Sequence, residues 1–191
     1  MARQPAADVR DHILDAAAKL FDAHGIHAVG LQQIIETYGC GKNLLYREFA
    51  SKDELIVAYL RRCQQDWSRT VATAIGSHEH DPAAALVALV RSVADQSICA
   101  GTRGCPLRNT FAEFPDPNHP AHPVAADHFR DVRELLHSLA AKTSAADPAV
   151  LADRVMLIID GVYANGATLG TSGAAPAAVQ FAEEIVAGMT R

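Results

Sequence analysis

The chain has 191 residues, of which 49% are apolar and 20% charged, so it contains enough apolar material for a buried core. This composition excludes an intrinsically disordered chain, and no apolar run approaches the roughly 20 residues that a membrane-spanning helix requires. The net charge of −5 lies wholly in residues 63–191, because residues 1–62 contain eight basic and eight acidic side chains. No apolar signal core follows Met1, and we therefore expect a cytoplasmic protein with no membrane partner.

The first predicted element is an amphipathic helix over Val9–Phe21, whose apolar residues fall on one stripe. Two shorter helices follow, at Leu31–Tyr38 and Lys42–Glu48, and the turn between them contains Gly39 and Gly41. Two short helices joined by a tight glycine-containing turn are the pattern of a helix-turn-helix.

The rest of the chain also has helical periodicity. Ser51 to Glu54 is a capping box, in which Ser51 caps the next helix and Glu54 reaches back to its start. Asp81-Pro82 and Asp147-Pro148 each combine an N-cap residue with a first-turn proline.

Prolines at positions 115, 117, 120 and 123 predict an extended or kinked connector before the following helix. The helices expected after the helix-turn-helix span residues 51–75, 82–99, 106–114, 123–142, 148–170 and 176–189. No segment has the period-2 pattern of a strand. The sequence therefore predicts an all-α fold of about nine helices.

A more specific pattern covers the stretch Val9 to Leu60, which resembles the tetracycline-repressor (TetR) family of one-component regulators. The matching residues are Ile13-Leu14-Asp15-Ala16-Ala17, Leu20-Phe21, Gly25, Ile34, Gly39, Lys42, Leu45-Tyr46, Phe49, Ser51-Lys52 and Leu55. The resemblance implies a helix-turn-helix DNA-binding domain at residues 1–50 and a helical ligand-binding and dimerisation domain at residues 51–191.

The same resemblance implies a transcriptional repressor that binds a palindromic operator in double-stranded DNA as a homodimer. A small-molecule effector, whose identity the sequence does not reveal, is expected to release it. We expect no cofactor and no enzymatic activity, since the sequence has no Gly-x-x-x-x-Gly-Lys, Gly-x-Ser-x-Gly or Gly-x-Gly-x-x-Gly motif. An enzyme built on the helical body is the alternative from another class.

The helix at residues 42–48 is the expected recognition helix, with Leu45 and Phe49 anchored in the core of the helix-turn-helix domain, residues 1–50 (the head). The remaining side chains of this helix are expected to face the major groove of the DNA: Lys42, Asn43, Leu44, Tyr46 and Arg47. Lysine and arginine can bind phosphates or guanine, asparagine can bind adenine, and the tyrosine hydroxyl can donate to a phosphate. Further candidates for contacts to the DNA backbone are Lys52, Gln32 and Gln33.

Three positions depart from the pattern of the TetR family. Gly30 stands where Thr or Ser usually caps the second helix, and Gly41 where a capping hydroxyl often opens the recognition helix. Leu44 stands where Thr often binds a phosphate, although leucine can instead touch a thymine methyl group. Because two hydroxyl contacts are missing, a helical scaffold that has lost DNA affinity is a second alternative.

The resemblance also implies that the last two helices form a four-helix bundle with those of a second copy. Small residues that allow close helix approach are Ala164, Gly166, Ala167 and Gly170, and an apolar stripe comprises Ala177, Phe181, Ile185 and Met189. The middle helices are expected to enclose a ligand pocket with apolar walls and a few polar groups. The candidate ligand contacts are Trp67, Arg91, Asn109, Phe111, Phe114, Phe129, Met156 and Tyr163.

Cysteine and histidine residues leave two further alternatives. The four cysteines at positions 40, 63, 99 and 105 are expected to be reduced thiols, with a Cys99–Cys105 redox switch as the alternative. A metal site could use His78-Glu79-His80, His119, His122, Cys99 and Cys105, but these residues lack the paired spacing typical of metal ligands.

Overall fold

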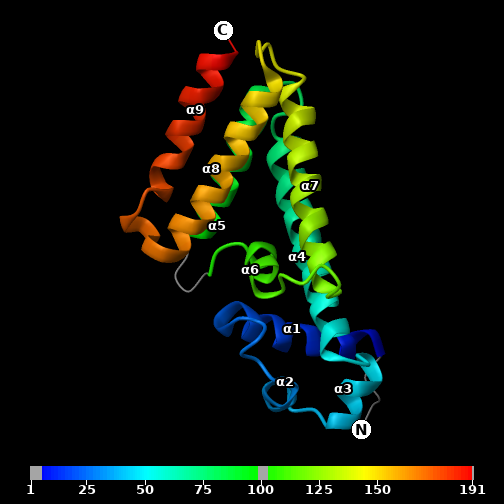
Figure 1. The fold of residues 1–191 in the computed structure, drawn as a ribbon. Coiled ribbons are helices and arrows are strands. Elements are labelled where there is room, and N and C mark those ends of the chain that lie inside the picture. Colours follow the sequence, from blue (N-terminus) through cyan, green and yellow to red (C-terminus); the bar gives the residue numbers. More distant parts are fainter. Residues whose placement is uncertain (1–5, 99–102, 191) are drawn as a thin grey trace. The chain divides into compact units, whose positions relative to one another are not determined.

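The computed structural model describes residues 6–98 and 103–190, and within them the chain is all-α (Figure 1). Its helices are α1 (Ala6–His24), α2 (Leu31–Tyr38), α3 (Lys42–Glu48), α4 (Lys52–Gly76), α5 (Pro82–Ser97), α6 (Pro106–Glu113), α7 (Ala121–Ala140), α8 (Pro148–Leu169) and α9 (Ala178–Met189). Two short 3₁₀ turns, η1 (Gly170–Ser172) and η2 (Ala175–Ala177), connect the last two helices. These nine helices confirm the expected fold class. None of them is both long and apolar enough to cross a membrane.

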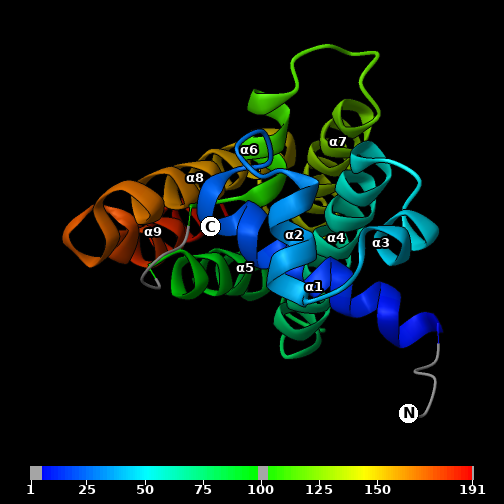
Figure 2. The ribbon, with the colours of Figure 1, turned by 90° about the horizontal axis from the view of Figure 1, so that it is seen from below.

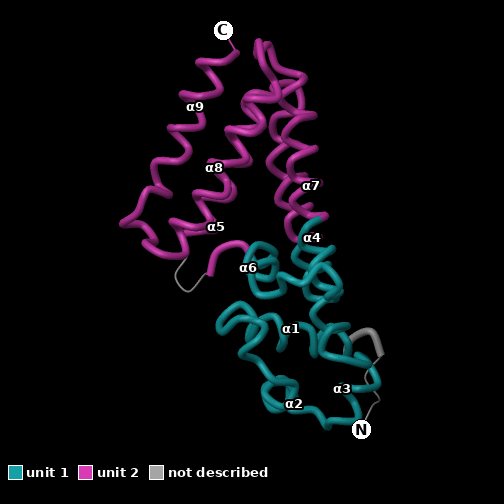
Figure 3. Tube along the Cα trace, in the orientation of Figure 1, with its two compact units in different colours: residues 1–63, 106–126 teal, residues 64–105, 127–191 magenta. Residues whose placement is uncertain are grey.

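The chain divides into two compact units (Figure 3). The first comprises residues 1–63 and 106–126, and the second comprises residues 64–105 and 127–191. The first unit therefore extends beyond residue 50, because the start of α4 contributes Leu55, Ile56 and Leu60 to its core, each at most 1% exposed. The separation into functional domains at residue 50 stays a prediction.

The helices α1, α2 and α3 each contribute fully buried side chains to the core of the first unit. Ile13 of α1, Ile34 of α2 and Leu45 of α3 are all completely buried, as is Phe49 directly after α3. The left-handed backbone of Gly39, with φ of +75°, ends α2 and allows its N–H to donate to the Ile35 carbonyl over 2.8 Å. The predicted bounds of α2 and α3 are confirmed as a result.

Other helix ends differ from the prediction by a few residues. α7 begins at Ala121 rather than at 123, and Pro123 occupies its first turn, where a missing N–H breaks no helical hydrogen bond. α5 ends at Ser97 rather than at 99, and α9 begins at Ala178 rather than at 176 because the 3₁₀ turn η2 precedes it. The prediction of these three ends was therefore wrong by two residues each.

The N-caps of α5 and α8 follow the prediction. The Asp81 carboxylate accepts from the Ala84 N–H over 2.9 Å, and the Asp147 carboxylate accepts from the Val150 N–H over 3.1 Å. Pro82 and Pro148 are the first residues of the two helices. Each aspartate thus satisfies one of the unpaired N–H groups at the helix start.

In the second unit, α5 packs against both α8 and α9, while α4 and α7 lie side by side (Figure 2). Leu86 and Leu89 of α5, Leu151 and Val155 of α8, and Ala182 of α9 are fully buried in this core. These residues follow the helical spacing that the sequence showed, so the core of this unit is the expected one.

Gly166 of α8 departs from its expected role. A Cβ at this position would meet the Ser97 carbonyl oxygen of α5 at 2.5 Å and the Ser97 Cβ at 2.7 Å. The absence of a side chain therefore serves packing against α5 of the same chain. The expectation that Gly166 allows the approach of a second copy was wrong.

Candidate nucleic-acid interface

Helix α3, the expected recognition helix, is seven residues long and is fixed at both ends. Gly41 is its N-cap, and the Gly41 carbonyl accepts from the N–H groups of Leu44, over 2.9 Å, and Leu45, over 3.3 Å. After the last helical residue, the Phe49 N–H donates to the Leu45 carbonyl over 2.9 Å. Since Leu45 and Phe49 are both completely buried, the opposite face of α3 is turned to solvent.

The side chains on that opposite face are the ones expected to read DNA. Lys42, Asn43, Tyr46 and Arg47 are all exposed, Tyr46 by 43%, while Leu44 is half-buried. The Lys42 ammonium lies 5.7 Å from the centre of the Tyr46 ring. A short helix therefore presents two cations, an amide and a phenol together, a combination that can bind phosphates and base edges.

Arg47 already has a partner on its own helix. Its Nε and Nη2 atoms donate to Glu48 Oε1 over 2.9 and 2.8 Å. A guanidinium has five N–H groups, so this pairing leaves donors for a phosphate or a guanine. The Arg47 side chain is 58% exposed but that of Glu48 only 12%, so a contact of Arg47 with DNA would compete with this ion pair.

The two glutamines of α2 have intramolecular roles. Gln33 Oε1 accepts from the Gly30 N–H over 3.1 Å and so stabilises the start of a helix whose N-cap has no side chain. Gln32 is exposed, and its amide donates to Glu36 Oε1 over 2.9 Å. Their contacts to DNA stay predictions, and that of Gln33 would compete with its role at the start of α2.

Lys52 is also engaged within the first unit. Its ammonium donates to the Ile26 carbonyl over 2.8 Å. Burial lowers the pKa of Lys52, although the nearby carboxylates of Glu113 and Asp53 oppose that effect. A contact from Lys52 to a phosphate stays a prediction, and it would require the ammonium to leave or share the Ile26 carbonyl.

The capping box at the start of α4 is only half as predicted. Ser51 Oγ accepts from the Glu54 N–H over 3.1 Å, as expected. The Glu54 carboxylate, however, accepts from the Ala50 N–H over 2.9 Å, one residue before the helix cap. This bond, together with the Arg10 guanidinium, lowers the pKa of Glu54.

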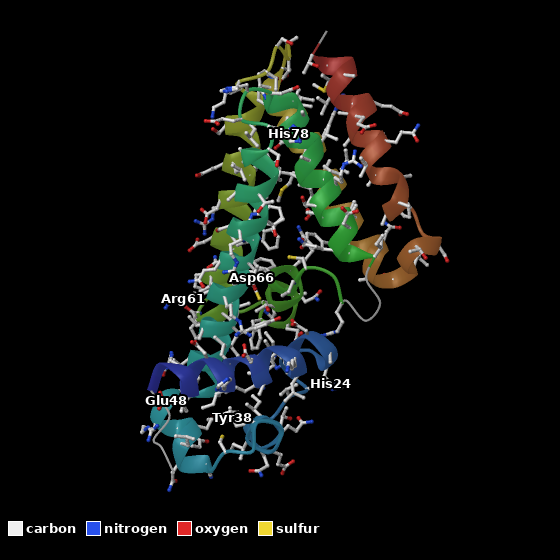
Figure 4. All side chains as sticks on the ribbon, turned by 180° about the vertical axis from the view of Figure 1, so that it is seen from behind. His24, Tyr38, Glu48, Arg61, Asp66 and His78 are labelled. Carbon is white, nitrogen blue, oxygen red and sulfur yellow. The ribbon has the colours of Figure 1, made fainter. Side chains whose placement is uncertain are left out.

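Arg10 of α1 supports α3, and no sequence pattern predicted this role. Its guanidinium carbon lies 4.0 Å above the Phe49 ring, and the group donates to the Glu48 carbonyl and to the Glu54 carboxylate. Glu48 is labelled beside the start of α1 in Figure 4. One side chain thus joins α1, the end of α3 and the start of α4.

A second group of contacts that sequence reasoning missed fastens the segment after α6 to the head. The Phe114 ring is stacked between the rings of His27 and His119, at centroid distances of 4.4 and 4.2 Å. The His27 N–H donates to the Glu113 carboxylate over 2.8 Å, and His119 Nε2 lies 3.5 Å from Asp53 Oδ1. These contacts explain why residues 106–126 belong to the first unit.

Four of the expected ligand contacts meet at one small cavity in the second unit. Trp67, Phe129, Met156 and Tyr163 line it together with Cys105 and four other residues. Burial raises the pKa of Tyr163, an effect to which the Cys105 thiol and the Asp160 carboxylate add. The sequence missed Asp160 and His128 of the same lining.

The other four expected ligand contacts do not line this cavity. Arg91 is exposed and pairs with Glu183 of α9 over 3.1 Å. Phe114, Asn109 and Phe111 belong to the first unit, where Phe114 is held between two histidines and Phe111 packs on the ring of His122. Their role in ligand binding stays a prediction.

The cysteine and histidine alternatives gain no support from the residues that the structure describes. Among them, no group of three or more His, Cys, Asp or Glu side chains is placed to hold a metal ion. Cys40, Cys63 and Cys105 form no disulfide within this part of the chain, and Cys105 is buried. The proposed partner Cys99 lies outside the described residues.

An apolar groove of about 680 Å³ runs along α8 and α9. Two large apolar side chains that line it are exposed, Leu157 by 70% and Phe181 by 52%. Phe181 and Ile185 of the predicted stripe on α9 both line this groove.

Comparisons with known proteins agree with the geometry of the first unit. The family model described as bacterial regulatory proteins, tetR family, matches residues 13–59. The transcriptional regulator YjdC of Escherichia coli is 24% identical over 182 residues, which cover 93% of each chain. The transcriptional activator FasR of Mycolicibacterium smegmatis is 40% identical over 60 residues, which cover 31% of this chain but only 27% of FasR.

The same relationship extends to solved structures. SCO4454, a TetR-family transcriptional regulator from Streptomyces coelicolor, superposes with a TM-score of 0.91 at 28% identity, over 97% of each chain. The family model thus identifies residues 13–59 as a TetR-family helix-turn-helix, the DNA-binding domain of that family, and over its whole length the chain is similar to TetR-family transcriptional regulators.

Proposed function

We propose that this regulator is a ligand-responsive repressor, which binds a palindromic DNA operator as a homodimer and leaves it when a small-molecule effector binds. The observation that carries the proposal is the construction of α3: Leu45 and Phe49 are completely buried, while Lys42, Asn43, Tyr46 and Arg47 are exposed. A helix anchored in this way can insert into the major groove with its polar face toward the bases. Such a protein would act where the DNA is, which in a bacterium is the cytoplasm.

Dimerisation follows from the small size of the reading surface. Four exposed side chains on one short helix supply too few base contacts for useful specificity, so two heads are needed for two half-sites. The groove along α8 and α9 supports this proposal, because its exposed Leu157 and Phe181 suit a symmetric apolar interface. The helices at residues 148–170 and 176–189 would then form the four-helix bundle between two copies of the chain.

The effector would bind among the helices of the second unit, where Trp67 and Tyr163 line a cavity. An effector can release the operator only if it binds the DNA-free conformation more tightly than the DNA-bound one. The relative FasR is named as an activator, so the direction of regulation requires its own measurement in a reporter strain.

The experiment begins with selection of operator DNA from a random pool by the full-length protein. The affinity for the selected sequence is then compared between wild type and Arg47→Ala. Removing one base or phosphate contact is expected to cost about 1–3 kcal/mol, which is roughly 5- to 150-fold in affinity for each of the two heads. Arg61→Ala, which removes the same charge from an exposed position on α4 (Figure 4), is the matched control and should change little.

The salt dependence of the operator affinity gives an independent measure of the number of ionic contacts to phosphate. If Arg47 binds a phosphate in both heads, its removal takes away two ionic contacts and should reduce the slope of log affinity against log salt by about 1.8. An unchanged affinity and slope in Arg47→Ala would remove this residue from the reading surface. Failure to select any sequence would favour the alternative of a scaffold without DNA affinity.

A further inference from the structure

Glu48 is an acidic residue on a helix that is expected to face DNA. It is the last residue of α3, and its side chain is only 12% exposed. The carbonyl groups at the end of a helix carry partial negative charge, so a carboxylate is unfavourable there unless a cation compensates it. The neighbouring Arg47 provides that cation, because the two side chains form an ion pair over 2.8 Å. The Glu48 carboxylate therefore acts on the DNA-facing side of α3 through Arg47.

The end of α3 is fastened to α1 and α4. Arg10 of α1 donates to the backbone carbonyl of Glu48 and to the Glu54 carboxylate. The Arg10 guanidinium also lies 4.0 Å above the Phe49 ring. If Arg47 moved away to bind a phosphate, the Glu48 carboxylate would lose two hydrogen bonds while it stayed largely covered, and this loss costs free energy. We therefore expect the ion pair to persist when DNA is bound.

The ion pair occupies one edge of the Arg47 guanidinium. Nε and Nη2 donate to Oε1 of Glu48 over 2.9 and 2.8 Å. A guanidinium has five N–H groups in one plane, so Glu48 does not use the two N–H groups of Nη1 or the second one of Nη2. The edge formed by Nη1 and Nη2 presents two parallel donors, which match O6 and N7 of guanine in the major groove. Competition with Glu48 is smallest on this edge, since a contact there needs neither N–H group that the carboxylate binds.

A base suits the Nη1–Nη2 edge better than a phosphate does. A phosphate bound by Arg47 would bring a second negative charge close to the Glu48 carboxylate, and like charges at such distances repel each other. Guanine carries no net charge, so it accepts the two hydrogen bonds without that repulsion.

We propose that Glu48 is a positioning residue, which holds Arg47 so that its Nη1–Nη2 edge reads one guanine in each half of the operator. Arg47 then contributes sequence specificity rather than a phosphate contact, because the ion pair as a whole carries no net charge. This inference rests on the proposed function, since it assigns a base preference to the same helix.

The base preferences of the full-length protein test the proposal. Wild type selects operator DNA from a random pool, and its affinity for that operator is compared with its affinity for operators in which one base pair of each half-site is changed. At one position guanine should be preferred over the other bases by about tenfold or more. Arg47→Ala should remove that preference, which assigns the position to Arg47. The slope of log affinity against log salt should change little in this variant, because no phosphate contact is lost.

Glu48→Ala releases Arg47 from its partner. The preference for guanine should therefore fall to about threefold or less, because the guanidinium is no longer oriented toward the base. The salt slope should become steeper by up to about 1.8 for two heads, because Arg47 can then bind a phosphate. In the Arg47→Ala background, Glu48→Ala should not change the base preference further, since Glu48 acts through Arg47.

Glu36→Ala is the matched control. It removes the same charge from an exposed position on α2, where Glu36 is bonded to Gln32. Repulsion between the protein and DNA of any sequence falls in both variants, so both can gain affinity for all sequences. The preference for guanine, however, should stay that of wild type in Glu36→Ala.

Two further measurements do not depend on the folding of Glu48→Ala, which circular dichroism and thermal unfolding monitor. Glu48→Gln keeps the shape of the side chain and weakens its hold on Arg47, so it should lower the guanine preference by about threefold. In wild type, 7-deazaguanine in place of the preferred guanine lacks the N7 acceptor and should weaken binding by about fivefold or more per half-site.

The inference is overturned if no base preference depends on Arg47, if Glu48→Ala keeps the guanine preference of wild type, or if Glu36→Ala lowers that preference equally. In each of these cases the operator itself is still bound, so the proposed function stands. Failure of wild type to select any operator would instead refute the proposed function.

Discussion

The groove along α8 and α9 makes the strongest quantitative prediction about assembly. Full burial of a leucine or phenylalanine side chain stabilises by about 1.5–3 kcal/mol. Leu157 is 70% exposed and Phe181 52%, so a partner that covers them gains about 1–2 and about 0.8–1.6 kcal/mol respectively. A two-fold axis doubles both contributions, because each copy supplies the same two side chains.

The perturbation is the double variant Leu157→Ala/Phe181→Ala. Because alanine keeps a Cβ, we expect a loss of about 3–5 kcal/mol of dimerisation free energy, which is roughly 150- to 5,000-fold in the dimer Kd. Sedimentation equilibrium over a dilution series measures that constant. Phe111→Ala, which removes an aromatic side chain that is 40% exposed in the first unit, is the control and should leave the Kd unchanged.

Equal dimer constants for wild type and the double variant would refute the reasoning, because the exposed apolar side chains would then have no part in assembly. A loss of folding in the double variant is distinguished by circular dichroism at the same concentrations. Since both side chains are exposed, we expect the helical signal to be preserved.

Three further predictions concern stability and can be measured by urea unfolding. Gly166→Ala should lower the free energy of unfolding by about 1–3 kcal/mol because its Cβ would overlap Ser97. The control Gly76→Ala, whose Cβ meets open space, should change it by less than about 1 kcal/mol. Equal losses in the two variants would contradict the packing argument. Burial lowers the pKa of His128, so below pH about 6.5 the unfolded chain binds a proton at this imidazole more readily than the folded chain does. The free energy of unfolding should therefore fall with pH in that range, by at most about 1.4 kcal/mol per pH unit from His128. His128→Phe should remove that contribution. Arg10→Ala should lower the free energy of unfolding by about 1 kcal/mol. It should also weaken operator binding, although Arg10 itself is not expected to contact DNA. An unaltered operator affinity would show that α3 does not need this support.

The helix-turn-helix could be predicted from the sequence because its determinants are local. Gly39 ends α2 through its own backbone conformation, and the buried Leu45 and Phe49 are separated by one helical turn. The same applies to Asp81 and Asp147, whose carboxylates bond N–H groups three residues away. Interactions over this distance leave a pattern in the sequence.

What could not be predicted depends on residues far apart in the chain. Arg10 donates to Glu54 across 44 residues, and His27 bonds to Glu113 across 86. No periodicity announces such pairs, since only the folded backbone brings them together. For the same reason the packing of Phe114 against His27 in the first unit was not predicted, and its expected role in ligand binding stays a prediction.

The charged residues of the head show a further limit of sequence reasoning. The position of a charged residue in the sequence does not reveal whether its side chain is already paired within the protein. The first 62 residues contain equal numbers of acidic and basic side chains, and several of the cations are engaged internally. Arg62 bonds Asp15, Lys52 bonds the Ile26 carbonyl, and Arg47 bonds Glu48. Among the described residues the head therefore offers DNA few uncommitted charges. The Glu48 side chain is only 12% exposed, and exchange of the Arg47–Glu48 pair for a phosphate would gain less than a new ionic contact.

Specificity in such a head must rest on neutral groups to a greater extent than in a strongly basic one. If Asn43 and Tyr46 bind DNA as expected, they would supply hydrogen bonds whose strength salt screens only weakly, and Leu44 would add an apolar contact to a thymine methyl. Non-specific affinity, which comes from phosphate contacts, should accordingly be low relative to operator affinity. The two hydroxyls absent at Gly41 and Leu44 act in the same direction, because each would have added a contact to the DNA backbone that carries no sequence information.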